Sequence, residues 1–243
     1  MRIVLLGISL LFSSNLYADL LGDGVREGFK GNYIKANELY KEACDEGNRG
    51  GCYALGLNYT AGKGVKQDHI KANELYLKAC DLGNMYGCSD LADSYRTERG
   101  VNQDNAKANE FYSKACDLRH DLACLLLGNI YNKGQGVKQD DTKAIEFYTK
   151  ACVHGRLIVC AMLGDLYLSG KGVTQNDTKA NEFYLKACEG EHSYACVQLG
   201  SNYDEGKGVK QDNFKASELY AQACDGGDMS GCYNLAINLA RGQ

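Results

Sequence analysis

The feature that constrains this chain most is the strict spacing of its cysteines. Twelve cysteines form two series, and each series steps by 36 residues without an insertion. The first series is Cys44, Cys80, Cys116, Cys152, Cys188 and Cys224, and the second is Cys52, Cys88, Cys124, Cys160, Cys196 and Cys232. An unbroken period of this size is typical of solenoids, in which each unit packs only on its neighbours. We therefore expect one continuous repeat array over residues 19–243.

Each period contains two segments with the apolar spacing of a helix, joined by a glycine-rich loop. In one segment the apolar stripe is Cys52, Leu55, Gly56 and Tyr59, and in the other it is Ala72, Leu75, Tyr76 and Ala79. Both follow the i, i+3, i+4, i+7 pattern of an amphipathic helix. The glycines of the loop 62–68 permit a helix end, and Asp68 can cap the helix that follows. The sequence thus predicts an all-α array of helix A, loop and helix B, with six to seven helix pairs and residues 233–240 as a C-terminal capping helix.

The two cysteines of each period lie eight residues apart, which on one continuous helix is about 12 Å. A disulfide needs Cα atoms roughly 4.4 to 6.8 Å apart, so the chain must reverse between them. Other connectivities are formally possible, but one local pairing respects the repeat and joins each helix B to the next helix A. The predicted pairs are Cys44–Cys52, Cys80–Cys88, Cys116–Cys124, Cys152–Cys160, Cys188–Cys196 and Cys224–Cys232.

The N-terminus has the pattern of a secretory signal peptide. Arg2 is followed by an apolar run over residues 3–12, a polar stretch and the small residue Ala18. We expect cleavage after Ala18 and a mature chain that is secreted or periplasmic and has no membrane span. With 27 Lys and Arg against 31 Asp and Glu, and no basic stretch, nucleic acid is not an expected partner.

The repeat resembles the Sel-one-like repeats, which are related to the tetratricopeptide repeat. The resemblance is carried by Leu-Gly-x-x-Tyr at 55–59, Gly-x-Gly-Val at 62–65 and the segment 71–80, which reads Lys-Ala-Asn-Glu-Leu-Tyr-Leu-Lys-Ala-Cys. With two cysteines per repeat it is similar, more narrowly, to the Helicobacter cysteine-rich proteins. The resemblance implies a right-handed α-solenoid whose helix-A face lines a concave groove. Departures such as Glu98, in place of the first loop glycine, bring only the local loop shape into question.

Arrays of this kind typically bind proteins or extended peptides, which is our first functional hypothesis. The expected groove residues are helix-A positions outside the apolar stripe that vary between repeats: Asn58, Asp93, Arg96, Asn129, Lys133, Asp165, Asn202 and Asp204. Asn amides can hold a peptide backbone, and the charged side chains can select among ligands. The alternative for each of them is a solvated helix surface. We expect a monomer with no cofactor.

Two further hypotheses stay open. Relatives are often labelled β-lactamase, which implies a penicillin-binding protein or hydrolase with a β-lactam or peptidoglycan-like ligand, although no Ser has Lys at i+3. The four histidines lie in different repeats, so neither a catalytic group nor a metal site is assigned. An exported effector that meets host or envelope proteins is the other hypothesis, with an apolar patch near the turns formed by Met85, Tyr86, Leu122, Leu157 and Ile158. The alternative for that patch is packing between repeats.

Overall fold

A computed structural model describes residues 20–242, in which helices and turns occur and no strand. Residues 20–29 form the first helix. The helices that follow are α2 (Tyr33–Asp45), α3 (Arg49–Ala61), α4 (His69–Asp81), α5 (Met85–Thr97), α6 (Asn105–Asp117), α7 (Asp121–Lys133), α8 (Asp141–Val153), α9 (Leu157–Ser169), α10 (Asp177–Glu189), α11 (Ser193–Glu205), α12 (Asn213–Asp225) and α13 (Met229–Ala240). The expected signal peptide, residues 1–18, lies outside the described residues.

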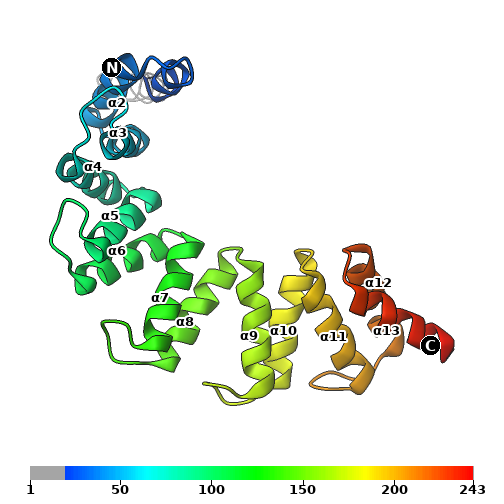
Figure 1. Ribbon diagram of the computed structural model, residues 1–243. Coiled ribbons are helices and arrows are strands. Elements are labelled where there is room, and N and C mark those ends of the chain that lie inside the picture. Colours follow the sequence, from blue (N-terminus) through cyan, green and yellow to red (C-terminus); the bar gives the residue numbers. More distant parts are fainter. Residues whose placement is uncertain (1–19, 243) are drawn as a thin grey trace, which may run out of the picture. The chain divides into compact units, whose positions relative to one another are not determined.

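The helices follow the repeat predicted from the cysteines, so the expected all-α solenoid is confirmed. Odd-numbered helices from α3 on are helix A and even-numbered helices are helix B, with a loop of constant length between them. The chain divides into two compact units, Met1–Ala123 and Cys124–Gln243. In the second unit, α9 packs against α10 and α11 against α12 as successive hairpins (Figure 1). The terminal α13 begins at Met229, four residues earlier than the sequence predicts.

The loop inside each hairpin is built as the sequence predicts. Gly62 ends α3 with φ of 69°, and the Asp68 carboxylate accepts hydrogen bonds from the backbone N–H groups of Ile70 and Lys71 to cap α4. In the next repeat Glu98 occupies the glycine position and adopts the same left-handed conformation, with φ of 58°. The loop shape is therefore kept there at the steric cost of a Cβ in this region.

Close packing inside a hairpin explains the small residue in the middle of helix A. The ring of Tyr184 on α10 is fully buried and lies directly over Gly164 on α9. A Cβ placed on Gly164 would lie 2.4 Å from Cε1 of Tyr184, closer than atoms in contact allow. The equivalent positions Gly56, Gly128 and Gly200 meet Tyr76, Tyr148 and Tyr220 in the same way. Glycine at this position lets the tyrosine ring fill the space between the two helices.

Disulfides join the end of helix B to the start of the next helix A. Five bridges have Cα atoms 4.5 to 4.9 Å apart: Cys44–Cys52, Cys80–Cys88, Cys152–Cys160, Cys188–Cys196 and Cys224–Cys232. Cys116 and Cys124 are also disulfide-bonded, and the described chain holds no free cysteine. Disulfides in such number indicate an oxidising compartment. Among the helices of residues 20–242, none is both long and apolar enough to cross a membrane.

Candidate functional site

Asparagine side chains connect helix B to the helix A of the next repeat at two contacts, α2 with α3 and α10 with α11. In the first unit, the Asn58 amide on α3 donates to Oδ1 of Asn37 on α2 at 2.6 Å. Asn37 in turn donates to the backbone carbonyl of Lys63, in the loop that follows α3, at 2.8 Å. In the second unit Asn202, Asn181 and Lys207 repeat this arrangement at 2.6 and 2.8 Å. Asn58 and Asn202, two of the expected groove residues, therefore hold neighbouring repeats together.

A second set of expected groove residues binds the tyrosine of its own hairpin. The Tyr112 hydroxyl donates to the Asp93 carboxylate at 2.6 Å, and the Tyr184 hydroxyl donates to Asp165 at 2.6 Å. The Tyr148 hydroxyl donates to Asn129 at 2.9 Å. Burial, strengthened by the carboxylate partner, raises the pKa of Tyr184 far above its ordinary value. These hydroxyls therefore stay protonated and act as hydrogen-bond donors.

The remaining expected groove residues differ in how many hydrogen bonds their side chains form. The Arg96 guanidinium donates to Asp93 at 2.7 Å and to the Tyr112 hydroxyl at 3.0 Å, yet half of its side chain is exposed. The Asp204 carboxylate accepts a hydrogen bond from the Asn238 amide at 3.2 Å. Lys133 lies exposed in the last turn of α7. Their part in ligand binding stays a prediction.

In the first unit, an aromatic cluster is formed by Tyr53 on α3, Tyr86 on α5 and His120 just before α7, beside a half-buried carboxylate. The rings of Tyr53 and Tyr86 stack with centroids 5.9 Å apart, and His120 meets Tyr86 edge-on at 5.3 Å. The Tyr53 hydroxyl donates to Asp90 at 3.0 Å. Burial raises the pKa of the Asp90 carboxyl, while the hydrogen bond from Tyr53 opposes this shift. Tyr86 remains 48% exposed, so the cluster keeps an aromatic side chain at the surface.

The second unit places an aromatic side chain at the position equivalent to Tyr86. The Tyr194 hydroxyl on α11 donates to Asp165 on α9 at 2.9 Å, across the contact between two repeats. Burial and the Asp165 carboxylate raise the pKa of Tyr194 to about 12. Tyr194 as a whole is 41% exposed. Asp165 therefore receives two tyrosine hydroxyls and fixes the position of an exposed ring.

The sequence interpretation missed Tyr53, Asp90 and Tyr194 as parts of these surfaces. Tyr86 and Tyr194 occupy one repeat position, which also holds Leu122 and Ile158. Aligning the repeats by their cysteines and comparing apolar residues outside the core stripe would have identified the position. Its hydrogen-bond partners follow from how one repeat packs on the next, which periodicity alone does not give.

The repeating pairs of helices agree with the result of a comparison with known protein families. Six consecutive segments match the family model described as Sel1 repeat: residues 13–48, 50–84, 86–120, 121–155, 158–192 and 193–228. The chain belongs to the Sel1 repeat family. The resemblance predicted from its loop and helix motifs is thus confirmed. A search of curated proteins finds no significant match.

Solved structures show other Sel1-type arrays. The protein c5321, a protective antigen of uropathogenic Escherichia coli, has a TM-score of 0.71 and 29% identity over 93% of this chain and 49% of its own. This chain thus spans about half the length of that protein. A Sel1 repeat protein from Oxalobacter formigenes has a TM-score of 0.61 and 27% identity, covering 87% of this chain and 86% of its own. Cysteine rich protein B of Helicobacter pylori is 37% identical, with a TM-score of 0.41, over 56% of this chain and 97% of its own.

Proposed function

We propose that this Sel1 repeat protein is an exported scaffold that binds a protein or peptide partner through its helix-A surfaces. One observation carries the proposal: the second position of helix A holds a large exposed apolar side chain in four successive repeats. These are Tyr86, Leu122, Ile158 and Tyr194, which are 48%, 41%, 63% and 41% exposed. Single exposed apolar residues are ordinary on a protein surface. A series of them at one repeat position, with two residues in each unit, forms a regularly spaced apolar surface of the kind that partners contact.

The tyrosines of this series are suited to act as binding anchors. Stacking on Tyr53 holds Tyr86, and the hydrogen bond to Asp165 holds Tyr194. A ring fixed before binding loses little side-chain entropy when a partner covers it. Arg96 and Lys133, exposed on helix A, supply charged groups that can select the partner. Of the groove residues predicted from the sequence, Asp165 contacts the series through Tyr194, and Arg96 and Lys133 lie at the other end of helix A.

Export to a secreted or periplasmic location is part of the proposal. It is supported by the disulfides, which persist in oxidising compartments, and by the signal-like pattern of residues 1–18. The E. coli relative is described as a protective antigen, a description that suits a protein accessible from outside the cell. A host protein and a cell-envelope protein are the two partner classes to compare.

The test is binding of oxidised mature protein to phage-displayed random peptides and to host and envelope extracts. Replacing Tyr86 and Tyr194 together by Ala should weaken selected ligands by roughly tenfold or more, since covering an apolar side chain contributes about 1.5 to 3 kcal/mol. Phe214→Ala is the matched control because Phe214 is 77% exposed on helix B, outside the series. Equal binding by the double variant and the native protein would contradict the helix-A assignment.

A further inference from the structure

The contact between α8 and α9 lacks the asparagine connection found at three other inter-repeat contacts, α2–α3, α4–α5 and α10–α11. Ile145 on α8 occupies the position of Asn37, Asn73 and Asn181, and Leu166 on α9 occupies the position of Asn58 and Asn202. At three contacts the helix-B Asn donates to a loop carbonyl, namely that of Lys63, Arg99 or Lys207. The equivalent carbonyl is that of Lys171, and Ile145 has no donor to offer it. In the described chain no other side chain takes that place.

The loop after α9 also stands farther from the preceding repeat than its equivalents do. A Cβ built on Gly64, Gly100 or Gly208 would lie 2.5 to 2.6 Å from the first residue of the preceding helix B. On Gly172 the same Cβ would lie 3.7 Å from Asp141. The pair of apolar side chains therefore coincides with a contact that is locally open.

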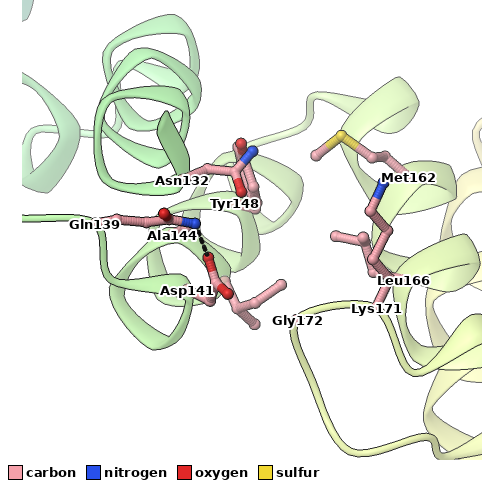
Figure 2. A pocket seen from close by; sticks show the side chains of 10 residues that line it. Asn132, Gln139, Asp141, Ala144, Tyr148, Met162, Leu166, Lys171 and Gly172 are labelled. Atoms are coloured by element: carbon pink, nitrogen blue, oxygen red, sulfur yellow. Dashed lines mark hydrogen bonds between the residues drawn. The ribbon is translucent and has the colours of Figure 1, made fainter. Parts of the chain in front are cut away.

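A cavity of about 250 Å³ occupies this opening. Asn132, Asp141 and Tyr148 line it from α7 and α8, and Met162 and Leu166 face them from α9 (Figure 2). Ala144, Ile145, Met162 and Leu166 form its apolar wall. Past Ile145 and Gly172 the cavity adjoins a shallower hollow of about 740 Å³. Together they provide an apolar cavity with a larger, more polar hollow beside it, which has room for a peptide chain.

The charged side chains at the rim of the cavity favour some ligands over others. Asp141 accepts a hydrogen bond from the Gln139 amide at 3.2 Å, whereas Lys171 is exposed and has no ion pair in the described chain. In the adjoining hollow, the Lys179 ammonium lies over the Tyr167 ring at 5.1 Å. A carboxylate next to the cavity would pair with Lys171, and a backbone N–H of the ligand can donate to the Lys171 carbonyl.

From these features we propose that the cavity between α8 and α9 binds one large apolar side chain of an extended peptide, with an acidic residue beside it held by Lys171. The inference rests on the proposed function in taking a peptide as the ligand class. It adds a specific subsite that is distinct from the exposed apolar residues of helix A. The preferred ligand therefore contains an Asp-Phe or Asp-Leu pair in an otherwise flexible segment.

The probe is the peptide Gly-Ser-Asp-Phe-Ser-Gly with blocked ends, titrated into oxidised full-length mature protein labelled at Ile, Leu and Met methyl groups. We expect the methyl resonances of Ile145, Met162 and Leu166 to shift in NMR spectra. Exchanging Phe for Ala in the peptide should weaken binding by roughly tenfold or more, the loss expected for an unfilled apolar subsite. Exchanging Asp for Lys should weaken it by about threefold to tenfold.

The decisive variant introduces the pair of asparagines that connects α2 with α3 and α10 with α11. Ile145→Asn combined with Leu166→Asn should close the cavity and abolish the methyl shifts at Met162, while Lys171→Glu should reverse the preference between Asp and Lys peptides. Phe214→Ala, outside the cavity in the same unit, should bind like the native protein. The far-UV spectrum and the melting temperature show whether the double variant folds, and Lys171→Glu, at an exposed position, gives an independent test if it does not.

The outcomes separate this inference from the proposed function. Absence of methyl shifts with the Asp-Phe peptide, or equal affinity for the Phe and Ala peptides, overturns the cavity assignment. If partners selected by phage display lose affinity in the Tyr86 and Tyr194 variant and not in the Ile145 and Leu166 variant, the scaffold function stands and the cavity proposal fails. If the peptide binds specifically at the cavity and the Tyr86 and Tyr194 substitutions have no effect on partner binding, the cavity proposal stands and the helix-A assignment fails.

Discussion

Removing one disulfide should loosen one place in the array and leave distant repeats unchanged. We consider Cys80→Ala combined with Cys88→Ala, at the junction of α4 and α5. The two cysteines are separated by 8 residues, and the loop-entropy relation for that ring gives about 2.5 kcal/mol at 25 °C. Both cysteines are buried, so the missing sulfur atoms add a packing loss to this value. The expected destabilisation is therefore at least about 2.5 kcal/mol.

Hydrogen–deuterium exchange read peptide by peptide is the suitable assay, because stability in a repeat array is a sum over units and their neighbours. A loss of about 2.5 kcal/mol corresponds to roughly sixtyfold faster exchange for amides protected by opening of this junction. We expect this acceleration in α4 and α5 and little change in α10 and α11. Leu82→Ala, an exposed substitution inside the same turn, is the control.

Two results would refute this reasoning. Equal acceleration in α4 and α10 would mean that the chain opens as one cooperative unit, so that the bridge stabilises the whole array. Acceleration of less than about threefold in α4 and α5 would mean that the folded hairpins already impose the constraint that we assign to the disulfide.

Three further predictions follow from the packing and the charges. Gly164→Ala should lower the free energy of unfolding by about 1 to 3 kcal/mol in urea titrations, because its Cβ would meet the Tyr184 ring at 2.4 Å; unchanged stability would show that the ring moves aside at no cost. Burial raises the Asp90 pKa, so the folded state binds a proton more readily than the unfolded state, and the Asp90 contribution to stability declines as pH rises through the folded pKa. Asp90→Asn should remove that decline in melting curves recorded from acidic to neutral pH, and a steeper decline in the variant would contradict the assignment. Purified oxidised protein should turn over nitrocefin no faster than a boiled sample, since no Ser has Lys at i+3; turnover that is lost on boiling would revive the β-lactamase hypothesis.

The fold could be predicted because its signals recur in every repeat. The period of Cys44 and its equivalents, the loop glycines and the cap at Asp68 all depend on local geometry, which a sequence pattern records directly. The disulfide pairing followed from the same local reasoning, because two cysteines at this separation can meet only across a chain reversal.

The residues of the candidate functional surface were harder to predict from the sequence than the fold. Asn202 was predicted to face a ligand because it lies outside the apolar stripe of its own helix, but it is 4% exposed and bonded to Asn181 of the preceding repeat. Hydrogen bonds of this kind depend on how one repeat packs on the next, and the sequence pattern within a single repeat carries no information about that packing. Ile145 and Leu166 were not noticed for the same reason, since each is an ordinary apolar residue until it is compared with the asparagine in other repeats.

The asparagine connection also bears on how such an array can grow. Where a helix-B Asn bonds the loop of the next repeat, the two surfaces match any other copy with the same residues, and a duplicated repeat can be inserted between them. Ile145 does not match those surfaces, because a helix-A Asn placed opposite it would lose the side-chain oxygen that accepts from its amide. Duplication of a repeat at the contact between α10 and α11 therefore preserves the asparagine bonds, whereas a copy placed beside α8 forms its contact without them.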